Sequence, residues 1–269
     1  MKSDLQIRQV DYSYFSGTVL HNITIHVKSG EMVGLLGPNG SGKTTLIKLA
    51  SGVLKPNQGD ISLDGSSLSH LSRKFIARNI AVVPQQFHVP FAFTVNEIVM
   101  LGRIPFVKAF TEESETDRQA VNNALGLVAI TELRRRRFEE LSGGERQKVI
   151  LAMALAQQPR LILLDEPIVH LDISHQLEIL DLLKNLNTEQ SLTVIAAMHD
   201  LNLASLYFNR LVLLKEGRVM ADGTPAQVLT EAMIQEVFST LVKVEPHPVA
   251  GVPHIVVTPK GNITDEPLL

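Results

Sequence analysis

Cysteine is absent from this chain of 269 residues. Its absence excludes a disulfide framework and cysteine-ligated metal centres, and it is compatible with a reducing compartment. Long hydrophobic runs are absent too, since no stretch approaches the ~18 apolar residues of a membrane-spanning helix. Residues 1–6 lack the apolar core of a signal peptide. We therefore expect an intracellular protein whose membrane role, if any, is peripheral.

A strong charge imbalance is also missing. The formal net charge is -3, which gives no general reason to expect nucleic acid as a partner. Hydrophobic residues at 45% and charged residues at 20% are ordinary for a globular protein. The length suits one large α/β domain, or one domain that carries a subdomain, with ample core.

Short apolar segments alternate with amphipathic helical stretches, which predicts a mainly parallel sheet covered by helices. We expect its core strands at 32–36, 80–83, 161–164, 193–197 and 211–214. Alternation with a period of two predicts a more exposed antiparallel sheet from 5–10, 23–27 and 60–63. Between 86 and 157 the strands stop, and we expect helices at 95–101, 112–125 and 142–156. The pattern therefore predicts an α/β core into which a helical subdomain is inserted.

One glycine-rich segment fits the pattern Gly-x-x-x-x-Gly-Lys-Ser/Thr of phosphate-binding loops. It consists of Gly37, Pro38, Asn39, Gly40, Ser41, Gly42, Lys43 and Thr44. A predicted strand precedes it and a predicted helix follows it, so backbone N–H groups and the positive end of the helix dipole converge on an anion. We expect Lys43 to reach the β- and γ-phosphates, Thr44 to complete a Mg²⁺ shell, and Thr45 to contact the region of the α-phosphate. The segment predicts a site for ATP and Mg²⁺.

Asp165 and Glu166 come directly after the apolar strand expected at 161–164. A buried parallel strand presents its last residues at the carboxyl edge of the sheet, where phosphate loops also lie. We expect Asp165 to hold Mg²⁺, directly or through water, because a hard cation prefers oxygen ligands. Glu166 then projects towards the γ-phosphate, where it orients or deprotonates the attacking water.

A second helix start of the kind that binds anions follows Leu141, and it consists of Ser142, Gly143, Gly144 and Glu145. One ATP does not easily need two such cradles from one chain, so we expect the second to serve a nucleotide held by a neighbouring copy. Residue by residue, the chain now resembles the ATP-binding cassette family, whose signature motif is this segment. The resemblance runs from about residue 5 to about residue 238.

The resemblance implies a P-loop NTPase core of the α/β class, with a mainly parallel sheet, an antiparallel β subdomain and an inserted helical subdomain at about 86–157. The nucleotide-binding ATPase domain spans 1–240 on this basis, and 241–269 forms a C-terminal tail packed on or extending from the core. The resemblance also implies head-to-tail dimers. Each ATP then lies between the phosphate loop of one copy and residues 142–144 of the other, so hydrolysis requires dimer closure.

Two further parts of the site follow from the resemblance. Tyr14 corresponds to the aromatic residue that stacks on adenine, and Tyr12 or Phe15 are the alternatives for this role. Asp172 fits the loop that communicates across the dimer. The small hydroxyl residues that the family usually has after Glu-Pro are replaced here by 168–169, Ile-Val. This departure affects the expected cross-dimer hydrogen bonds and removes no catalytic group.

The resemblance also assigns two side chains near the terminal phosphate. Gln85 looks like the glutamine that contacts Mg²⁺ and the attacking water while hinging the helical subdomain, and Gln86 is the alternative register. His199 ends another predicted strand and matches the family's switch histidine. Its expected hydrogen-bonding partners are the γ-phosphate and Glu166.

Other conspicuous residues have ordinary interpretations. The run 134–137, four arginines, is expected to be a solvated helix end, and contact with anionic lipid headgroups is the less favoured alternative. His247 and His254 lie among prolines in a segment without helical pattern, and a metal site there would need more ligands at defined spacing.

Within the family, the stretches 101–105, 171–176 and 199–204 look like ATPases of bacterial importers for iron-siderophore, haem or cobalamin. This resemblance implies two copies on two integral membrane permease subunits, at the cytoplasmic face of the membrane, fed by an extracytoplasmic substrate-binding protein. The permease groove is expected near 85–103. Its candidate contacts, which are equally consistent with subdomain core, are Phe87, Pro90, Phe91 and Phe93.

Two other classes compete with transport. A cassette ATPase of DNA maintenance carries long coiled-coil insertions between the phosphate loop and the signature, and no sustained heptads occur here. A P-loop kinase or GTPase leaves the 141–145 segment unexplained, and the chain has no Asn-Lys-x-Asp element that would recognise guanine. We therefore expect an ATPase that powers transport and binds no nucleic acid.

Overall fold

The computed structural model describes residues 3–15, 17–87, 92–107 and 113–257. The strands are β1 (Leu5–Tyr14), β2 (Gly17–Val27), β3 (Met32–Leu36), β4 (Gln58–Leu63), β5 (Ser66–Ser67), β6 (Ile80–Val83), β7 (Leu161–Asp165), β8 (Thr193–Ala197), β9 (Arg210–Lys215), β10 (Arg218–Gly223), β11 (Lys243–Pro246) and β12 (Pro253–Val256). The α-helices are α1 (Lys43–Ala50), α2 (Arg73–Asn79), α3 (Val95–Leu101), α4 (Glu115–Leu127), α5 (Gly143–Ala156), α6 (Ile173–Gln190), α7 (Leu201–Tyr207), α8 (Pro225–Val228) and α9 (Glu231–Phe238). Short 3₁₀ turns cover η1 (Leu68–His70), η2 (Thr131–Leu133) and η3 (Phe138–Glu140).

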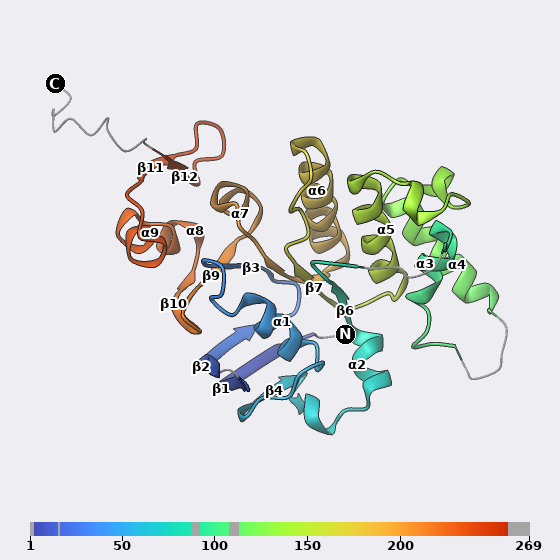
Figure 1. Cartoon of the computed structure of the whole chain (residues 1–269), viewed down its shortest axis with the longest axis horizontal. Coiled ribbons are helices and arrows are strands. Elements are labelled where there is room, and N and C mark those ends of the chain that lie inside the picture. Colours follow the sequence, from blue (N-terminus) through green and yellow to red (C-terminus); the bar gives the residue numbers. More distant parts are fainter. Residues whose placement is uncertain (1–2, 16, 88–91, 108–112, 258–269) are drawn as a thin grey trace.

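The central sheet has the strand order β10-β9-β3-β8-β7-β6 (Figure 1). From β9 to β6 the neighbours are parallel, and β10 is antiparallel to β9. Every residue of β3, β7 and β8 is buried, as expected for parallel strands covered on both faces. The prediction of a mainly parallel sheet is confirmed, and the edge strand β10 is an addition to it. The carboxyl ends of the parallel strands share one edge, so the loops that follow them meet there.

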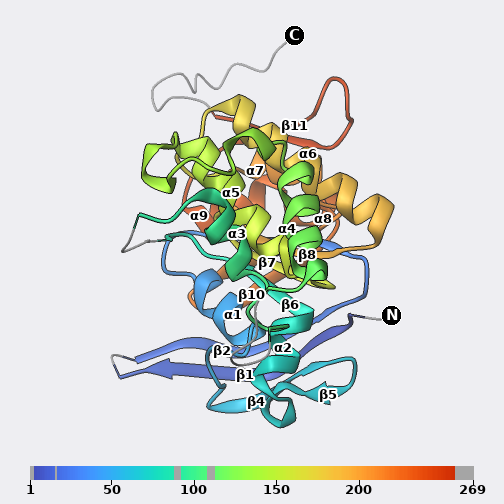
Figure 2. The same cartoon turned by 90° about the vertical axis from the view of Figure 1, so that its right-hand side faces the viewer.

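A smaller antiparallel sheet, in the order β2-β1-β4-β5, lies across α1 from the central sheet (Figures 1 and 2). Its inward-facing side chains, such as Ile7 and Ile25, share one apolar cluster with Leu46 of α1 and Leu163 of β7. The predicted antiparallel sheet is therefore confirmed. Because α1 is packed between two sheets, its N-terminus is held rigidly at the carboxyl edge of β3.

The helices α3, α4 and α5 form a layer beside the edge strand β6, where the sequence predicts helices (Figure 2). The second of them begins at Glu115 rather than at residue 112, because Ser114 caps it in a reciprocal capping box with Asp117. Asp117 also accepts a hydrogen bond of 2.9 Å from Nε of the buried Arg103. Arg103 in turn donates to the carbonyl of Ala156 at the end of α5, at 2.8 Å. This buried ion pair ties the three helices together.

The C-terminal part carries a feature that the sequence does not predict, a hairpin of β11 and β12. The side chain of Asn202 in α7 receives a hydrogen bond from the Ile255 backbone N–H at 2.7 Å and donates to its carbonyl at 3.2 Å. Ser205 donates to the carbonyl of Pro253 at 2.7 Å. The hairpin is therefore fastened to α7 by side chains from a distant part of the chain.

The rings of His247 and His254 meet edge to face with centroids 5.6 Å apart. Across the described residues, no group of three or more His, Cys, Asp or Glu side chains is arranged to hold a metal ion. The same part of the chain contains no helix whose length and apolar character would allow it to cross a membrane.

Candidate nucleotide site

The loop between β3 and α1 is shaped by two glycines that no other residue could replace without strain. Gly37 has φ 146°, and a Cβ there would lie 2.2 Å from the carbonyl oxygen of Leu214. Gly42 precedes α1 with φ 104°, and a Cβ there would lie 2.5 Å from a methyl group of Leu20. Both values lie in the region that favours glycine. The backbone can therefore curl at the start of α1 and leave the first helical N–H groups directed at the hollow of the loop.

The residues that line the hollow of this loop fit the phosphates of a nucleotide. The hollow has a volume of about 140 Å³ and is lined by Val19, Asn39, Gly40, Ser41, Gly42, Lys43, Thr44, Thr45 and Glu166. Within the described part of the chain, the buried hydroxyl of Ser41 has no hydrogen-bond partner. A buried polar group without a partner is costly, and a phosphate oxygen would satisfy it. The N-terminus of α1 adds a positive dipole end at the same place.

Lys43 is buried within the loop and lowers the cost of that burial by local contacts. Its ammonium group donates to the carbonyl oxygens of Gly37 at 2.7 Å and Pro38 at 3.2 Å. Burial lowers the pKa of Lys43, and the negative charges of Glu166 and Asp165 partly oppose this effect. A bound anion would favour the charged ammonium further, because opposite charge stabilises the protonated form. Lys43 is therefore placed to neutralise phosphate.

Thr44 and Asp165 form an oxygen-rich corner beside Lys43. The Thr44 hydroxyl donates to Oδ1 of Asp165 at 3.0 Å. Burial raises the pKa of Asp165, and the hydrogen bond from Thr44 partly opposes this effect. A carboxylate whose charge is disfavoured by burial gains most from a nearby cation, and hard divalent cations prefer such oxygen ligands. The hydroxyl oxygen of Thr44 and the carboxylate of Asp165 are therefore suitable ligands for Mg²⁺.

Glu166 is the point where the ends of three neighbouring strands converge. Its Oε2 accepts a hydrogen bond of 2.6 Å from the amide of Gln85, which follows β6. Its Oε1 lies 2.5 Å from Nε2 of His199, which follows β8. The backbone of Glu166 is left-handed, with φ 54°, and the side chain is only 11% exposed. The protein therefore holds this carboxylate in one orientation from both sides, next to the phosphate loop.

The segment 142–145 lies elsewhere, at the start of α5 in the helical layer, whereas the phosphate loop starts α1 (Figure 1). Ser142 caps α5, and its N–H and hydroxyl both donate to Oε2 of Glu145, at 2.8 and 2.9 Å. These bonds from Ser142 lower the pKa of Glu145. Apart from its chain neighbours and its own helix backbone, no described atom lies within 4 Å of a Cβ built on Gly143, and Ser142 and Gly143 are exposed, so the helix start is open. The carboxylate of Glu145 caps its own helix, and the open face belongs to Ser142 and Gly143.

The aromatic residues at the end of β1 differ in exposure. Tyr14 ends β1 and is 40% exposed, with its ring edge against Tyr12 at a centroid distance of 4.9 Å. Phe15 is fully exposed. Asp172 lies after β7 as the N-cap of α6, with its side chain 64% exposed. These side chains are accessible to a ligand or to a second copy.

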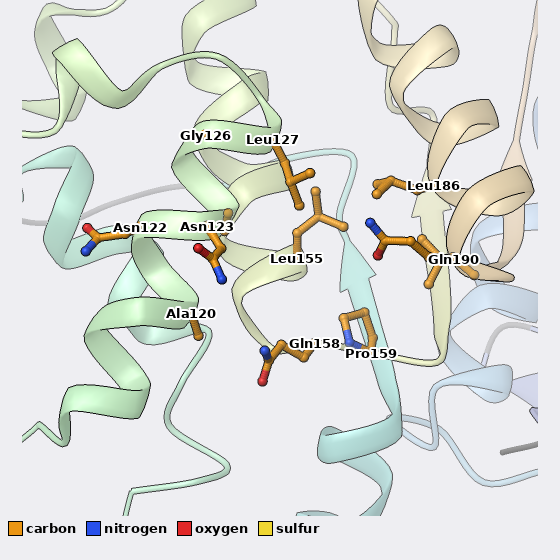
Figure 3. Close-up of a pocket in the computed structure, with 12 residues that line it drawn as sticks. Ala120, Asn122, Asn123, Gly126, Leu127, Leu155, Gln158, Pro159, Leu186 and Gln190 are labelled. Carbon is orange, nitrogen blue, oxygen red and sulfur yellow. The ribbon is translucent and has the colours of Figure 1, made fainter.

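A larger hollow, of about 720 Å³, lies between α4 and the ends of α5 and α6 (Figure 3). Leucine side chains and the amides of asparagine and glutamine line much of it. Its lining residues carry no ionisable group, so it offers neither acid–base chemistry nor carboxylate ligands. We therefore place the chemistry at the phosphate loop.

One residue that braces the loop is not among those predicted from the sequence. Gly217, in the turn between β9 and β10, donates its N–H to the carbonyl of Ser41 at 3.2 Å and accepts from the N–H of His21 at 2.8 Å. A Cβ on Gly217 would lie 2.1 Å from the carbonyl oxygen of Val19. The only sequence signal is a glycine after a predicted strand. Gly217 thus connects the phosphate loop to the antiparallel sheet.

We expect Gly217→Ala to raise the KM for ATP roughly two- to tenfold, the range of one backbone hydrogen bond, with little change in kcat. The added methyl group forces the turn away from Val19, and the contact with Ser41 is lost. Gly251→Ala is the matched control, because Gly251 also has a positive φ but has open space around its Cβ position. Calorimetric ATP titration and steady-state kinetics measure the effect. Equal KM values for ATP in the two variants would contradict this supporting role of Gly217.

Comparison with known proteins adds the family context. The family model described as ABC transporter matches residues 20–169. The ferric enterobactin transport ATP-binding protein of Escherichia coli (strain K12) is 38% identical over 252 residues, which cover 94% of this chain and 93% of the relative. The cobalamin import ATP-binding protein of Halobacterium salinarum is 37% identical, over 97% of this chain and 64% of the relative.

Solved structures agree with this context. A metal-chelate type ABC transporter in an inward-facing conformation matches with a TM-score of 0.84 and 30% identity, covering 97% of this chain and 99% of that one. A dimeric bacterial ABC transporter cassette matches with a TM-score of 0.74 and 30% identity, covering 82% of this chain and 98% of that one.

Proposed function

We propose, from the premise that this chain belongs to the ABC transporter family, that it powers bacterial uptake of an iron-siderophore, haem or cobalamin. The chain is an ATP-binding subunit that hydrolyses ATP for transport, and such subunits work as dimeric cassettes with membrane subunits. The observation that carries the finer proposal is similarity along nearly the whole chain to importers of metal chelates and cobalamin. The place of action is then the cytoplasmic face of the membrane.

Two copies in head-to-tail arrangement would complete each ATP site. The phosphate loop would form one side of the ATP site. The open start of α5 lies at a different place in the same chain, so a second copy would supply the other side. Ser142 and Gly143 leave that helix start accessible, as an anion site on a partner would require. The similarity to a dimeric cassette supports this arrangement. Closure of the dimer and hydrolysis are thereby linked.

Within each site the roles follow from the contacts. Lys43 and the N-terminus of α1 would bind the phosphates, while Tyr14 would stack on the adenine. Thr44 and Asp165 would hold Mg²⁺, which neutralises phosphate charge when bound, and Gln85 would contact the same ion from its place beside Glu166. These groups position the terminal phosphate in the hollow beside Glu166.

Glu166 would accept the proton of the attacking water. The amide of Gln85 and the ring of His199 hold its two oxygens, so the carboxylate faces the hollow in one orientation. Reorientation of the side chain is therefore not part of the cost of reaching the transition state.

Dimer closure would be transmitted to a permease through the surface that begins at the end of β6 and continues along α3. Phe87 and Phe93 pack against the helical core, and the ring of Phe87 meets Phe138 edge to face at 6.1 Å. The other two candidate permease contacts, Pro90 and Phe91, lie outside the described residues. Two exposed apolar side chains, Leu101 at the end of α3 and Ile104 in the turn after it, are accessible to a membrane subunit. We propose this edge as the docking groove.

The test uses a strain of the source organism that lacks the gene. We expect the intact gene to restore uptake of one radiolabelled cargo among ferric siderophores, haem and cobalamin, and a copy encoding Lys43→Ala to restore none. Lys43 is a sound choice because its ammonium group lies inside the hollow of the loop. Unchanged uptake of all three cargo classes in the deletion strain would exclude the importer proposal.

The competing function is an ABC ATPase of DNA maintenance. Among the described residues between α1 and α5, the longest helix has 13 residues, which leaves no room for a coiled-coil arm there. Purified wild-type protein separates the two functions, because DNA would stimulate hydrolysis by a DNA-maintenance ATPase and a permease would stimulate a transport subunit.

A further inference from the structure

His175 joins the two segments that the shared site would bring to a partner copy. It lies in the first turn of α6, three residues after the N-cap Asp172. The backbone N–H of His175 donates to Oδ1 of Asp172 at 2.9 Å, and Nδ1 of its ring lies 2.8 Å from the same oxygen. These two bonds lower the pKa of Asp172 and keep it ionised. An ionised carboxylate only accepts hydrogen bonds, so Nδ1 carries the proton.

The other edge of the ring lies on the start of α5. A Cβ built on Gly144 would lie 2.4 Å from Cδ2 and 2.7 Å from Nε2 of His175, so only glycine allows the ring this position. The next turn provides a second link, since Nζ of Lys148 in α5 lies 2.6 Å from Oε2 of Glu178 in α6. The start of α5 and the start of α6 are therefore packed together through His175.

The loop after Glu166 contains two neighbouring side chains that cannot hydrogen-bond. Its residues 168–169 are isoleucine and valine, and Ile168 is buried. The first turn of α6 holds the loop instead. The amide of Gln176 donates to the carbonyls of Ile168 at 3.3 Å and Leu171 at 3.0 Å, while His175 holds the side chain of Asp172.

We propose that His175 is a positioning residue for ATP-driven dimer closure, which holds the Asp172 carboxylate against the start of α5 so that both segments meet the partner as one surface. This inference rests on the proposed function, because it requires a site shared between two copies. The side chain of Asp172 is 64% exposed while His175 is 32% exposed, so the carboxylate is the group that a partner reaches. His175 acts through Asp172 and touches no phosphate in this arrangement.

The experiment compares His175→Ala, His175→Asn and His175→Gln in the full chain. An asparagine amide can donate from nearly the position of Nδ1, whereas a glutamine amide reaches beyond Asp172. We expect His175→Ala and His175→Gln to raise the ATP concentration at half-maximal dimerisation about tenfold and to lower kcat similarly, as for one hydrogen bond to a charged group. His175→Asn should stay within about threefold of the wild type for the same reason.

Binding of ATP to the monomer should be unchanged in all three variants, because His175 lies outside the phosphate loop. Dimerisation is measured by light scattering in a Glu166→Gln background, whereas kcat is measured with Glu166 intact and the permease present. His70→Ala is the control for loss of an exposed histidine. Equal loss in His175→Ala and His175→Asn would reduce His175 to simple packing and overturn the proposal, as would wild-type dimerisation of His175→Ala.

A double-mutant cycle covers the case in which the alanine variant is unstable. If His175 acts through Asp172, then His175→Gln combined with Asp172→Asn should be no worse than Asp172→Asn alone. Additive losses would overturn the inference. A wild-type protein that neither dimerises with ATP nor hydrolyses it would instead remove the shared site itself, so the two failures are distinguishable.

Discussion

Replacing Glu166 by glutamine is expected to abolish steady-state ATP turnover while ATP binding and dimer closure persist. The amide has the size of the carboxylate but cannot take a proton from the attacking water, and loss of a general base costs ~10²–10⁴-fold in rate. The change leaves in place Lys43 and the start of α1, which would bind the phosphates. Closed dimers should therefore accumulate, because the nucleotide that holds them together is not consumed.

Light scattering with saturating Mg-ATP and the permease present measures the dimer, and phosphate release measures turnover. The matched control is Glu236→Gln on the exposed surface of α9, which makes the same chemical change away from the hollow. The contacts of Gln85 and His199 predict that Glu166→Gln stays folded, since one oxygen remains to accept a hydrogen bond. A monomeric Glu166→Gln protein under these conditions would count against the mechanism.

The core strands can be predicted from the sequence because their apolar segments are stable only in the interior of the protein. Every residue of strands β3 and β7 is buried, and both strands are apolar apart from Asp165 at the end of β7. An apolar segment of this kind is stable inside a covered sheet. The positions of Gln85, Glu166 and His199 follow from the same rule, since each comes shortly after a predicted strand. Adjacent parallel strands then bring their ends together without any further information.

Features that depend on contacts between distant segments are not predictable in this way. The hairpin of β11 and β12 contains prolines and no clear alternation, and its attachment comes from Asn202 and Ser205 in α7. The role of Gly144 as a seat for the ring of His175 is likewise invisible in a local pattern. Burial of Arg103 with Asp117 depends on three helices meeting at one point. In each case the stabilising group and its partner lie in different elements.

Ser142→Arg tests the shared site most directly. We expect the variant to bind ATP in its own phosphate loop and to lose turnover, because the arginine would project from the open start of α5 into the site of the partner copy. Calorimetry measures the binding and phosphate release the turnover. Ser72→Arg is the matched control, because it removes the equivalent serine cap from α2 on an exposed surface. The loss of a helix cap alone should leave turnover largely intact.

Mixing two inactive variants distinguishes a shared site from a site within one chain. In a mixed dimer of Ser142→Arg and Lys43→Ala, head-to-tail geometry combines both defects in one site and leaves the other site intact. Random mixing should therefore recover about a quarter of the wild-type turnover, because half of the dimers are mixed and each has one complete site. If each chain instead completed its own site, both sites of every mixed dimer would carry a defect and no turnover would return. Normal hydrolysis by the Ser142→Arg protein on its own would be equally incompatible with the shared site.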